Sequence, residues 1–377
     1  VVSGIDGRVT SGGSQHFLDG DKRIFDNTIL RMSVRTNQSG VTCCLHSAHG
    51  YAINGESVQG KRMPIVDRRY MAMKAAFDVK AGQTLSVAKL TAVTTSRDLA
   101  YHGLDDTAEM ALKDGLEILR MAVNKGYDRL FEESCEKWAA LWKQADIKID
   151  SKRPFDQLLI RFALYHLNIM IKKDDSRVGI GAKGLTGEGY KGHSFWDTEI
   201  FILPYFIFTQ PKAARTLLEY RYRGLFGARM KAAENGYEGA MYPWEAAWID
   251  EGEVAPLWGA MDIVTGEPVK ILTGIIEQHI TADVAFGVAQ YDAVTGDQDF
   301  MDRCGYEILI DTARFWASRA TWDEEKIRHV ILDVIGPDEY KEHVDNNAYT
   351  NYMAAYNMEL ALKAIAALKA RGGKVYE

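Results

Sequence analysis

The spacing of the apolar residues changes once along the chain, near residue 100, and this change restricts the possible folds more than any other feature. Before it, residues 28–36, 41–49 and 84–94 are rich in β-branched residues or alternate between apolar and polar positions, as strands do. Turns that contain glycine, such as residues 54–55, separate the strand-like stretches. The pattern predicts an antiparallel β-sandwich, or part of one, over residues 1–100.

Beyond this point the apolar residues recur at helical spacing. Segments 107–122 and 127–145 form a helical pair, which we interpret as a linker spanning residues 101–150. Residues 151–377 then hold longer helices that are separated by glycine or proline. The expected bounds are 155–173, 198–209, 212–235, 269–294, 299–320 and 349–371. Helices with wide apolar faces and no strands between them predict helix-on-helix packing, in a bundle or an α/α toroid.

The composition argues against several functional classes. The 377 residues are 47% hydrophobic, enough for a large core, and the net charge of −7 argues against a surface for nucleic acid or an anionic membrane. No apolar stretch reaches the ~18 residues of a membrane-spanning helix. The four cysteines include no CxxC pair, so we expect reduced thiols in a cytoplasmic protein. On a strand, Cys44 and His46 would face one side and Cys43 and His49 the other, so we expect no metal site there.

The residues that suggest a binding site lie in the connections between the helices. The first, residues 183–199, has four glycines in nine residues before His193, Trp196 and Asp197. Glycine lets the backbone approach a ligand closely, yet neither a dinucleotide fingerprint nor a P-loop is present. A tryptophan beside an aspartate can stack on a sugar face while the carboxylate accepts hydroxyl groups. The structural alternative is that Asp197 or Thr198 caps the helix and Trp196 belongs to the core.

Two further connections between helices also combine aromatic and acidic residues. Residues 239–253 combine aromatic and acidic side chains, with the alternative of an aromatic lid over helix ends. In residues 333–350, Gly336-Pro337 forces a turn that displays Asp338 and Glu339 on a loop. The cluster at residues 345–347 then precedes the next helix, and the alternative here is a solvated loop plus a helix cap.

Three loops that combine aromatic residues with carboxylates suggest a carbohydrate-binding cleft. Aromatic faces bury the C–H side of a pyranose, and carboxylates and amides satisfy its hydroxyl groups. The sequence offers no Ser-His-Asp signature, HExxH motif or cysteine-nucleophile motif as a rival chemistry.

These loops resemble the signature of the disaccharide phosphorylases of glycoside hydrolase family 65. The matching blocks lie in order at residues 187–199 (ending GHSFWDTE), 242–245 (YPWE) and 336–340 (GPDEY, followed by Asn346-Asn347), and IDGRVT at 5–10 extends the resemblance into the β region. The family includes maltose, kojibiose, nigerose and trehalose phosphorylases. The resemblance implies an N-terminal β-sandwich, a helical linker, an (α/α)6 barrel and a small C-terminal sheet domain, and it implies a homodimer.

The resemblance also implies the reaction and the site. Glu339 is expected as the general acid in the phosphorolysis of an α-linked glucose disaccharide to β-glucose 1-phosphate and glucose, with inversion. Because phosphate is already an anionic nucleophile, no second carboxylate is needed to activate water. A disaccharide and inorganic phosphate are the expected partners, with no metal or other cofactor. The implied sugar-binding residues are His193, Trp196, Asp197, Trp244, Glu245 and Asn347.

The chain also departs from the family pattern. It has only about six long barrel helices, half the family number, and it ends soon after Glu339, so we interpret it as an internal portion of a longer enzyme. The family's phosphate-binding residues would lie beyond it. Residues 247–259 resemble kojibiose-type more than maltose-type enzymes, which mildly favours kojibiose.

Two other functional readings stay open. One is an inverting hydrolase on the same scaffold, in which a second carboxylate such as Glu245 or Glu253 activates water. The other is a non-catalytic carbohydrate-binding protein, in which Glu339 only accepts hydroxyl groups.

Overall fold

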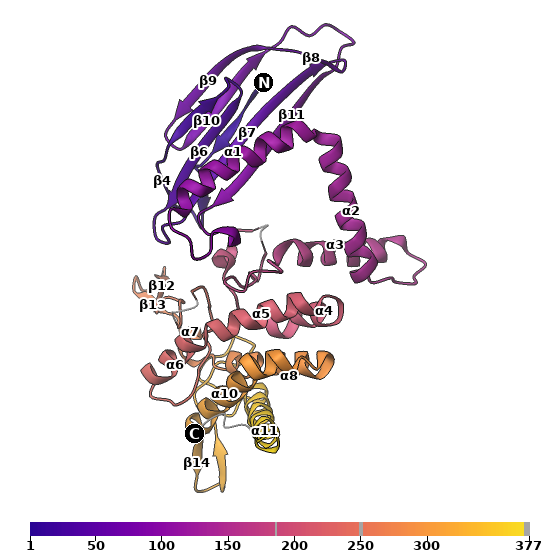
Figure 1. Ribbon diagram of the computed structural model, residues 1–377. Coiled ribbons are helices and arrows are strands. Elements are labelled where there is room, and N and C mark those ends of the chain that lie inside the picture. The colour runs from indigo at the N-terminus through magenta and orange to yellow at the C-terminus, as the bar shows by residue number, and fades with distance from the viewer. Residues whose placement is uncertain (185–186, 249–251, 373–377) are drawn as a thin grey trace. The chain divides into compact units, whose positions relative to one another are not determined.

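The computed structural model describes residues 1–184, 187–248 and 252–372, and the chain divides into two compact units (Figure 1). The first unit is Val1–Lys143 and the second is Gln144–Glu377. Among the described residues, no helix has the length and apolar character that crossing a bilayer requires.

The first unit is built on two antiparallel sheets. The smaller sheet has the strand order β1-β10-β9, and the larger has the order β11-β7-β6-β4, with β5 paired to β6 and β8 to β7. The bounds are β1 Val2–Asp6, β4 Phe17–Leu18, β5 Lys22–Phe25, β6 Ile29–Thr36, β7 Thr42–Ile53, β8 Glu56–Ser57, β9 Lys61–Asp67, β10 Tyr70–Ala76 and β11 Leu85–Thr95. A further hairpin joins β2 (Thr10–Ser11) to β3 (Ser14–Gln15). The three stretches that the sequence predicted as strands are β6, β7 and β11.

Apolar side chains fill the space between the two sheets. One core cluster combines Ile5 and Met71 of the smaller sheet with Leu30, Met32 and Val34 of the larger. Alternate residues of a strand point to opposite faces, so a strand of the larger sheet can contribute to this core and also to a second one. The predicted β-sandwich is therefore confirmed.

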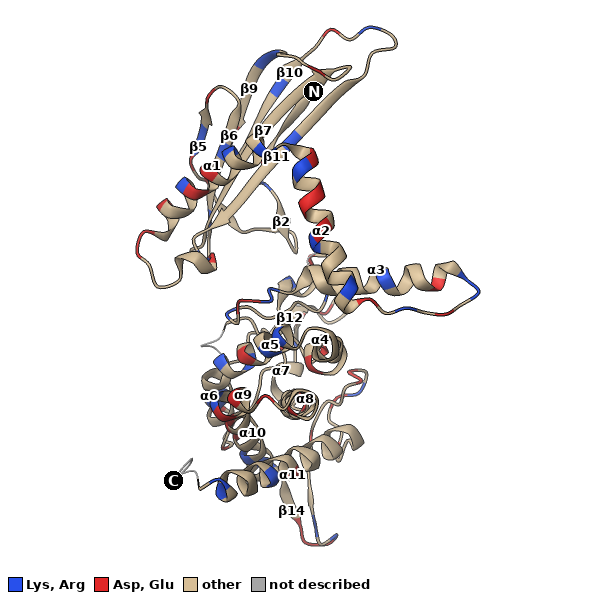
Figure 2. Cartoon of the chain, turned by 45° about the vertical axis from the view of Figure 1, so that its right-hand side comes forward, with Lys and Arg blue, Asp and Glu red and all other residues tan. Residues whose placement is uncertain are grey.

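Helix α1 (Thr107–Lys125) covers the other face of the larger sheet, where it packs on β7 and β11 (Figure 1). Gly115 permits this close approach, because a Cβ there would lie 2.7 Å from both His46 Nδ1 and Thr94 Oγ1. The next helix, α2 (Tyr127–Ala145), carries charged residues of both signs along its length (Figure 2).

The second unit consists mainly of helices packed on one another. Their bounds are α3 Pro154–Met170, α4 Leu203–Thr209, α5 Pro211–Arg223, α6 Leu225–Glu234, α7 Thr273–Ile276, α8 Ile280–Thr295, α9 Gln298–Phe300, α10 Tyr306–Arg319 and α11 Ala348–Ala370. Helix α8 is apolar on nearly every side, as its scarcity of charge in Figure 2 shows, and it packs against α4, α5, α10 and α11. A helix with this composition belongs in a core. The predicted helix-on-helix architecture after a β-sandwich is confirmed.

Two expectations about these helices are wrong. The helix expected at 269–294 begins only at Ile280, because Pro268–Lys270 forms strand β13 and α7 ends at Ile276. The carbonyl of Ile276 accepts a hydrogen bond from the backbone N–H of Ile335 (3.0 Å), which replaces a helical bond. The helix expected at 212–235 breaks at Gly224 into α5 and α6.

The expectation of no strands between the helices is also wrong. Two short hairpins interrupt them: β12 (Trp258–Met261) pairs with β13, and β14 (Thr321–Asp323) pairs with β15 (Arg328–Val330). In addition, the chain enters α4 through a π-helical turn at Thr198–Ile202.

Candidate active site

Three segments of the second unit carry the sequence-predicted site residues. We call them the tryptophan segment (residues 193–199), the YPWE segment (residues 242–246) and the acid loop (residues 333–347). All three lie in connections that precede helices or join them.

The tryptophan segment and the YPWE segment are joined directly. The backbones of Ser194 and Ala246 exchange two hydrogen bonds of 2.9 and 3.0 Å. Beside this bridge, Nδ1 of His193 lies 2.7 Å from Oε1 of Glu245. The structure therefore brings two of the predicted sugar-binding residues into contact.

A buried arginine that the sequence reading missed holds both segments. Arg221 of α5 forms a two-pronged ion pair with Glu199, with N–O distances of 2.7 and 2.8 Å, and its Nη2 also donates to the carbonyl of Phe195 (2.9 Å). The hydroxyl of Tyr242 donates to the carbonyl of Arg221 (2.9 Å). Because both charged side chains are buried and paired, Glu199 has a structural role in the tryptophan segment.

The predicted sugar platform, Trp196, is half-buried and packs against the core, and its contact with a sugar stays a prediction. Its ring meets His279 and Tyr349 edge-on, with centroid distances of 4.9 and 6.0 Å. The capping alternative is wrong. Asp197 makes no capping hydrogen bond, and Thr198 Oγ1 has no hydrogen-bond partner among the described residues.

Backbone bonds fix the ends of the acid loop. Val334 and Val344 exchange two hydrogen bonds of 3.0 and 2.8 Å, and the bond from Ile335 to Ile276 ties the loop to the last residue of α7. Gly336 then turns closely against the side chain of Asn347, since a Cβ at this position would lie 2.3 Å from its Nδ2. The loop therefore has a defined base.

Asn347 caps helix α11. Its Oδ1 accepts a hydrogen bond from the backbone N–H of Thr350 (3.0 Å), which is the cap that the sequence allowed as an alternative. This contact uses the oxygen of the amide, so any contact to a sugar would come from its Nδ2. Sugar binding by Asn347 stays a prediction.

Glu339 is exposed at the tip of the acid loop. With Pro337, Asp338 and Tyr340 it lines an open pocket of about 540 Å³. The carboxylate of Asp338 accepts a hydrogen bond from the backbone N–H of Tyr340 (3.2 Å), which stabilises the turn. Both acids line the pocket, and Asp338 in addition has a contact within the turn.

Behind the site lies a buried row of charged side chains at the start of α8, which we call the acid–histidine chain. Nδ1 of His279 lies 2.6 Å from Oδ2 of Asp283, and its Nε2 lies 3.1 Å from Oε1 of Glu277. The hydroxyl of Tyr349 donates to the other oxygen of Asp283 (2.7 Å). The three charged side chains are 0% exposed. The sequence reading missed all three.

The environment shifts the pKa values of two groups of the acid–histidine chain, Glu277 and His279. Burial raises the pKa of Glu277 to about 7, the charge of Glu339 adds to this rise, and His279 and the Trp244 side chain oppose it. Burial by itself lowers the pKa of His279, but the hydrogen bonds and charges of Asp283 and Glu277 outweigh it and raise the pKa to about 9. At neutral pH His279 is therefore an imidazolium that can donate to a carboxylate at each nitrogen.

Glu253 organises the YPWE segment. Its Oε2 accepts hydrogen bonds from Lys231 Nζ (2.6 Å) and the backbone N–H of Trp244 (2.8 Å). Its Oε1 accepts from the backbone N–H groups of Glu245 (2.9 Å) and Ala255 (3.1 Å). Both oxygens are occupied, so Glu253 acts as a support for the loop.

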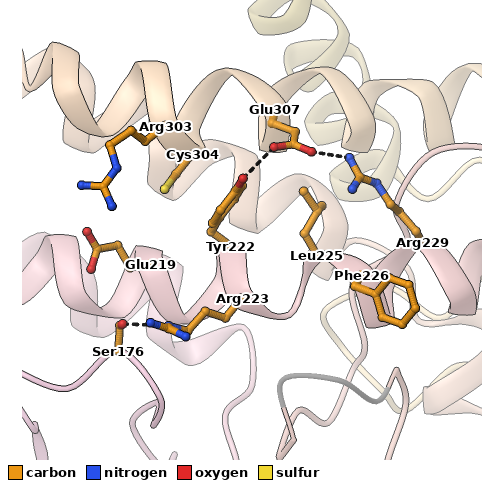
Figure 3. A pocket seen from close by; sticks show the side chains of 10 residues that line it. All are labelled: Ser176, Glu219, Tyr222, Arg223, Leu225, Phe226, Arg229, Arg303, Cys304 and Glu307. Atoms are coloured by element: carbon orange, nitrogen blue, oxygen red, sulfur yellow. Dashed lines mark hydrogen bonds and ion pairs between the residues drawn. The ribbon is translucent and has the colours of Figure 1, made fainter. Parts of the chain in front are cut away.

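Another pocket of the second unit lies elsewhere, between α5–α6 and the start of α10 (Figure 3). It measures about 610 Å³ and contains none of the predicted site residues. Glu307 in its wall accepts hydrogen bonds from Tyr222 (2.8 Å) and from Arg229 (2.6 Å), and Arg223 donates to Ser176 (2.9 Å). Within the described ranges, no three side chains of His, Cys, Asp or Glu come together in a way that could hold a metal ion.

Comparisons with known proteins match both units. Residues 161–375 match the glycosyl hydrolase family 65 central catalytic domain, and residues 1–141 match the N-terminal domain of that family. A kojibiose phosphorylase of Halothermothrix orenii is 48% identical over 362 residues, which are 96% of this chain and 46% of that protein. A kojibiose phosphorylase of Escherichia coli is 39% identical over 366 residues, again 96% of this chain and 46% of that protein.

Two further matches extend the comparison. A kojibiose hydrolase of Flavobacterium johnsoniae is 38% identical over 79% of this chain and 40% of its own length. A solved structure described as a putative kojibiose phosphorylase from the human microbiome has the same fold, with a TM-score of 0.78 and 22% identity over 97% of this chain and 45% of that one. The chain spans about half the length of the curated relatives it matches.

Proposed function

This chain belongs to glycoside hydrolase family 65, and from this premise we propose that it carries the catalytic acid and much of the sugar site of a disaccharide phosphorylase. The proposed substrate is an α-linked glucose disaccharide, with kojibiose favoured because the two phosphorylases described above bear that name. The products are β-glucose 1-phosphate and glucose. Inorganic phosphate is the co-substrate, and no other cofactor takes part.

The acid loop is the observation that carries the proposal. Its base is fixed by the Ile335–Ile276 bond, while Glu339 is exposed to an open pocket at its tip. In the proposed step, Glu339 gives its proton to the glycosidic oxygen as the bond from that oxygen to the anomeric carbon breaks. An oxygen of phosphate forms the new bond to this carbon from the opposite face, so the configuration inverts. Glu339 then regains a proton before the next turnover.

The neighbouring segments would hold the sugar units. Trp196 offers an aromatic face and Asp197 a carboxylate without a capping role, which suits the transferred glucosyl unit. The His193–Glu245 pair and Trp244 would bind the sugars from the other segment. We include in the proposal that the enzyme is a cytoplasmic homodimer, which rests on the family resemblance and on the reduced cysteines.

A hydrolase is the second candidate, because one relative is a kojibiose hydrolase. An inverting hydrolase needs a base about 6.5–9.5 Å from the acid to deprotonate water. The two carboxylates considered for this role already have partners: Glu253 supports the YPWE segment and Glu245 binds His193. Phosphorolysis needs no such base, so the contacts of these two residues favour it.

The test is to incubate the full-length enzyme with kojibiose, nigerose, maltose and trehalose, each with and without phosphate. Proton NMR of the first turnovers identifies the anomer directly. We expect β-glucose 1-phosphate, formed fastest from kojibiose and only in the presence of phosphate. Release of glucose alone would establish the hydrolase, and α-glucose 1-phosphate would indicate a retaining, two-step route through a carboxylate nucleophile. Binding without cleavage would indicate a carbohydrate-binding protein.

A further inference from the structure

Three aromatic side chains from different segments meet one another behind the site. The ring of Trp196 in the tryptophan segment lies 4.9 Å from the ring of His279, the N-cap residue of α8, and 6.0 Å from the ring of Tyr349 in α11, centroid to centroid. The rings of His279 and Tyr349 lie 5.3 Å apart. Each pair meets edge to face, an arrangement that aromatic rings prefer. The indole therefore rests on two rings that distant parts of the chain supply.

Asp283 binds both of these supporting rings. Its Oδ2 lies 2.6 Å from Nδ1 of His279, and its Oδ1 accepts a hydrogen bond from the hydroxyl of Tyr349 (2.7 Å). The side chain of Asp283 is 0% exposed. One buried carboxylate thus holds a ring on its own helix and a ring on α11 at the same time. Neither ring can turn without leaving a polar group unpaired in the interior, which costs free energy.

The backbone around Trp196 is fixed by other contacts, which leave the rotation of its side chain open. The ion pair of Arg221 with Glu199 and its hydrogen bond to the carbonyl of Phe195 hold the residues on either side. The orientation of the indole depends instead on what the ring packs against. A third ring in contact with it, Phe201, is 63% exposed and belongs to the same segment. The supports that are themselves hydrogen-bonded are the two rings that Asp283 holds.

We propose that Asp283 is a positioning residue for Trp196: by fixing His279 and Tyr349, it holds the half-buried indole in the orientation that stacks on the transferred glucosyl unit. This inference rests on the sugar-binding role proposed for Trp196. An indole that tilts after losing a support would no longer lie parallel to the C–H face of the pyranose. A displacement of about 1 Å in a group that positions a substrate can lower the rate by about 100-fold. A carboxylate that only stabilised the fold would affect unfolding and leave sugar binding unchanged.

The test begins with single variants of the full-length enzyme. Tyr349→Phe keeps the ring and removes only the hydroxyl that Asp283 binds, so we expect KM for kojibiose to rise about three- to tenfold with kcat changed by less than about twofold. Asp283→Asn has a single acceptor oxygen for two donors, so its KM should rise further. Tyr356→Phe makes the same chemical change on α11, where the ring packs on Phe286, and is the matched control with an unchanged KM. If Asp283→Asn folds poorly, Tyr349→Phe decides alone.

A double-mutant cycle then asks whether the effect passes through the indole. Trp196→Leu by itself should raise KM about tenfold for every disaccharide that the enzyme cleaves. In this background Tyr349→Phe should add less than about twofold, because the ring that it orients is gone. Losses that multiply would overturn the proposal, and so would a lower urea midpoint with an unchanged KM in Tyr349→Phe.

The same measurements separate this inference from the proposed function. An unchanged KM in Trp196→Leu would refute the sugar-binding role of Trp196, and the inference with it. Each reaction is run with and without phosphate. Cleavage without phosphate would refute the proposed phosphorolysis alone, since the cycle reports on sugar binding under either mechanism.

Discussion

The protonated carboxyl of Glu339 is the single group on which the proposed chemistry depends. Replacing it by glutamine keeps the shape of the side chain but removes the transferable proton. We expect Glu339→Gln to lower kcat on kojibiose by about 10²–10⁴-fold in the full-length enzyme, with a much smaller change in KM. Steady-state kinetics measure both quantities.

Asp338 provides the matched control for this variant. Its carboxylate already accepts the backbone N–H of Tyr340, so Asp338→Asn should loosen the turn and cost far less activity. If Glu339→Gln kept most of its activity while Asp338→Asn lost it, the role of the acid would pass to Asp338.

Asp197 is proposed to bind the glucosyl unit that all the candidate disaccharides share. Asp197→Asn replaces a charged acceptor by a neutral one, and a hydrogen bond to a charged group contributes about 1.5–3 kcal/mol. We therefore expect kcat/KM to fall by about 10–150-fold for every disaccharide that the enzyme cleaves. A loss confined to one disaccharide would place Asp197 at the acceptor sugar instead.

Among the elements, those specified by local sequence could be predicted and those specified by distant contacts could not. The strands β6, β7 and β11 and the helices α1 and α2 follow from periodicity, and their observed bounds agree to within a few residues. The expected helix at 269–294 fails because a hydrogen bond from Ile335, far along the chain, occupies the carbonyl of Ile276. No local sequence pattern indicates a hydrogen bond to a residue so far along the chain.

The same distinction applies to the candidate site. The tryptophan segment, the YPWE segment and the acid loop are each contiguous, so their residues could be named from the sequence. Other residues act through contacts between segments, and their spacing along the sequence does not distinguish them from other helical residues. They are Arg221, Glu277, His279 and Asp283. One signal was present: the stretch EQHITAD places charged residues at the entrance of a helix that is otherwise apolar on nearly every side.

The two possible roles of Asn347, helix cap and sugar ligand, can be separated by paired substitutions. Asn347→Ala removes the cap of α11 and should lower the free energy of unfolding by about 1 kcal/mol. Asn347→Asp keeps an oxygen that can accept from Thr350, so it should retain most of the stability. The Asp variant lacks the amide Nδ2, the atom left for a sugar. Denaturant unfolding and KM for kojibiose measure the two effects, and an unchanged KM in Asn347→Asp would leave Asn347 as a cap alone.

At the scale of the whole molecule, each unit has its own core. The change of periodicity near residue 100 predicted a β-sandwich followed by helix-on-helix packing. In the second unit the largely buried helix α8 starts with the acid–histidine chain. Since the charged groups lie in the interior of that unit, their protonation is linked to its folding. The stability of the second unit should therefore depend on pH in a way that its buried groups predict.

The sign of this dependence follows from the two raised pKa values. His279 has a pKa of about 9 in the folded chain against a reference of 6.5, so its contribution is complete below pH 6.5 and is lost as the pH rises through 9. Glu277, with a pKa of about 7 against 4.5, also makes the folded state bind more protons, so stability falls further between pH 4.5 and 7. We expect the free energy of unfolding to decrease from pH 5 to pH 9.5, with a contribution from His279 of up to about 3 kcal/mol.

Urea unfolding followed by circular dichroism at several pH values measures this decrease, and His279→Gln supplies the comparison. The variant is less stable at pH 6, where the imidazolium contributes fully, but its curve should flatten between pH 7 and 9.5 because the titrating group is gone. The two curves should therefore approach each other as the pH rises. Parallel curves would mean that the pH dependence comes from other groups, and that His279 is not charged in the folded chain.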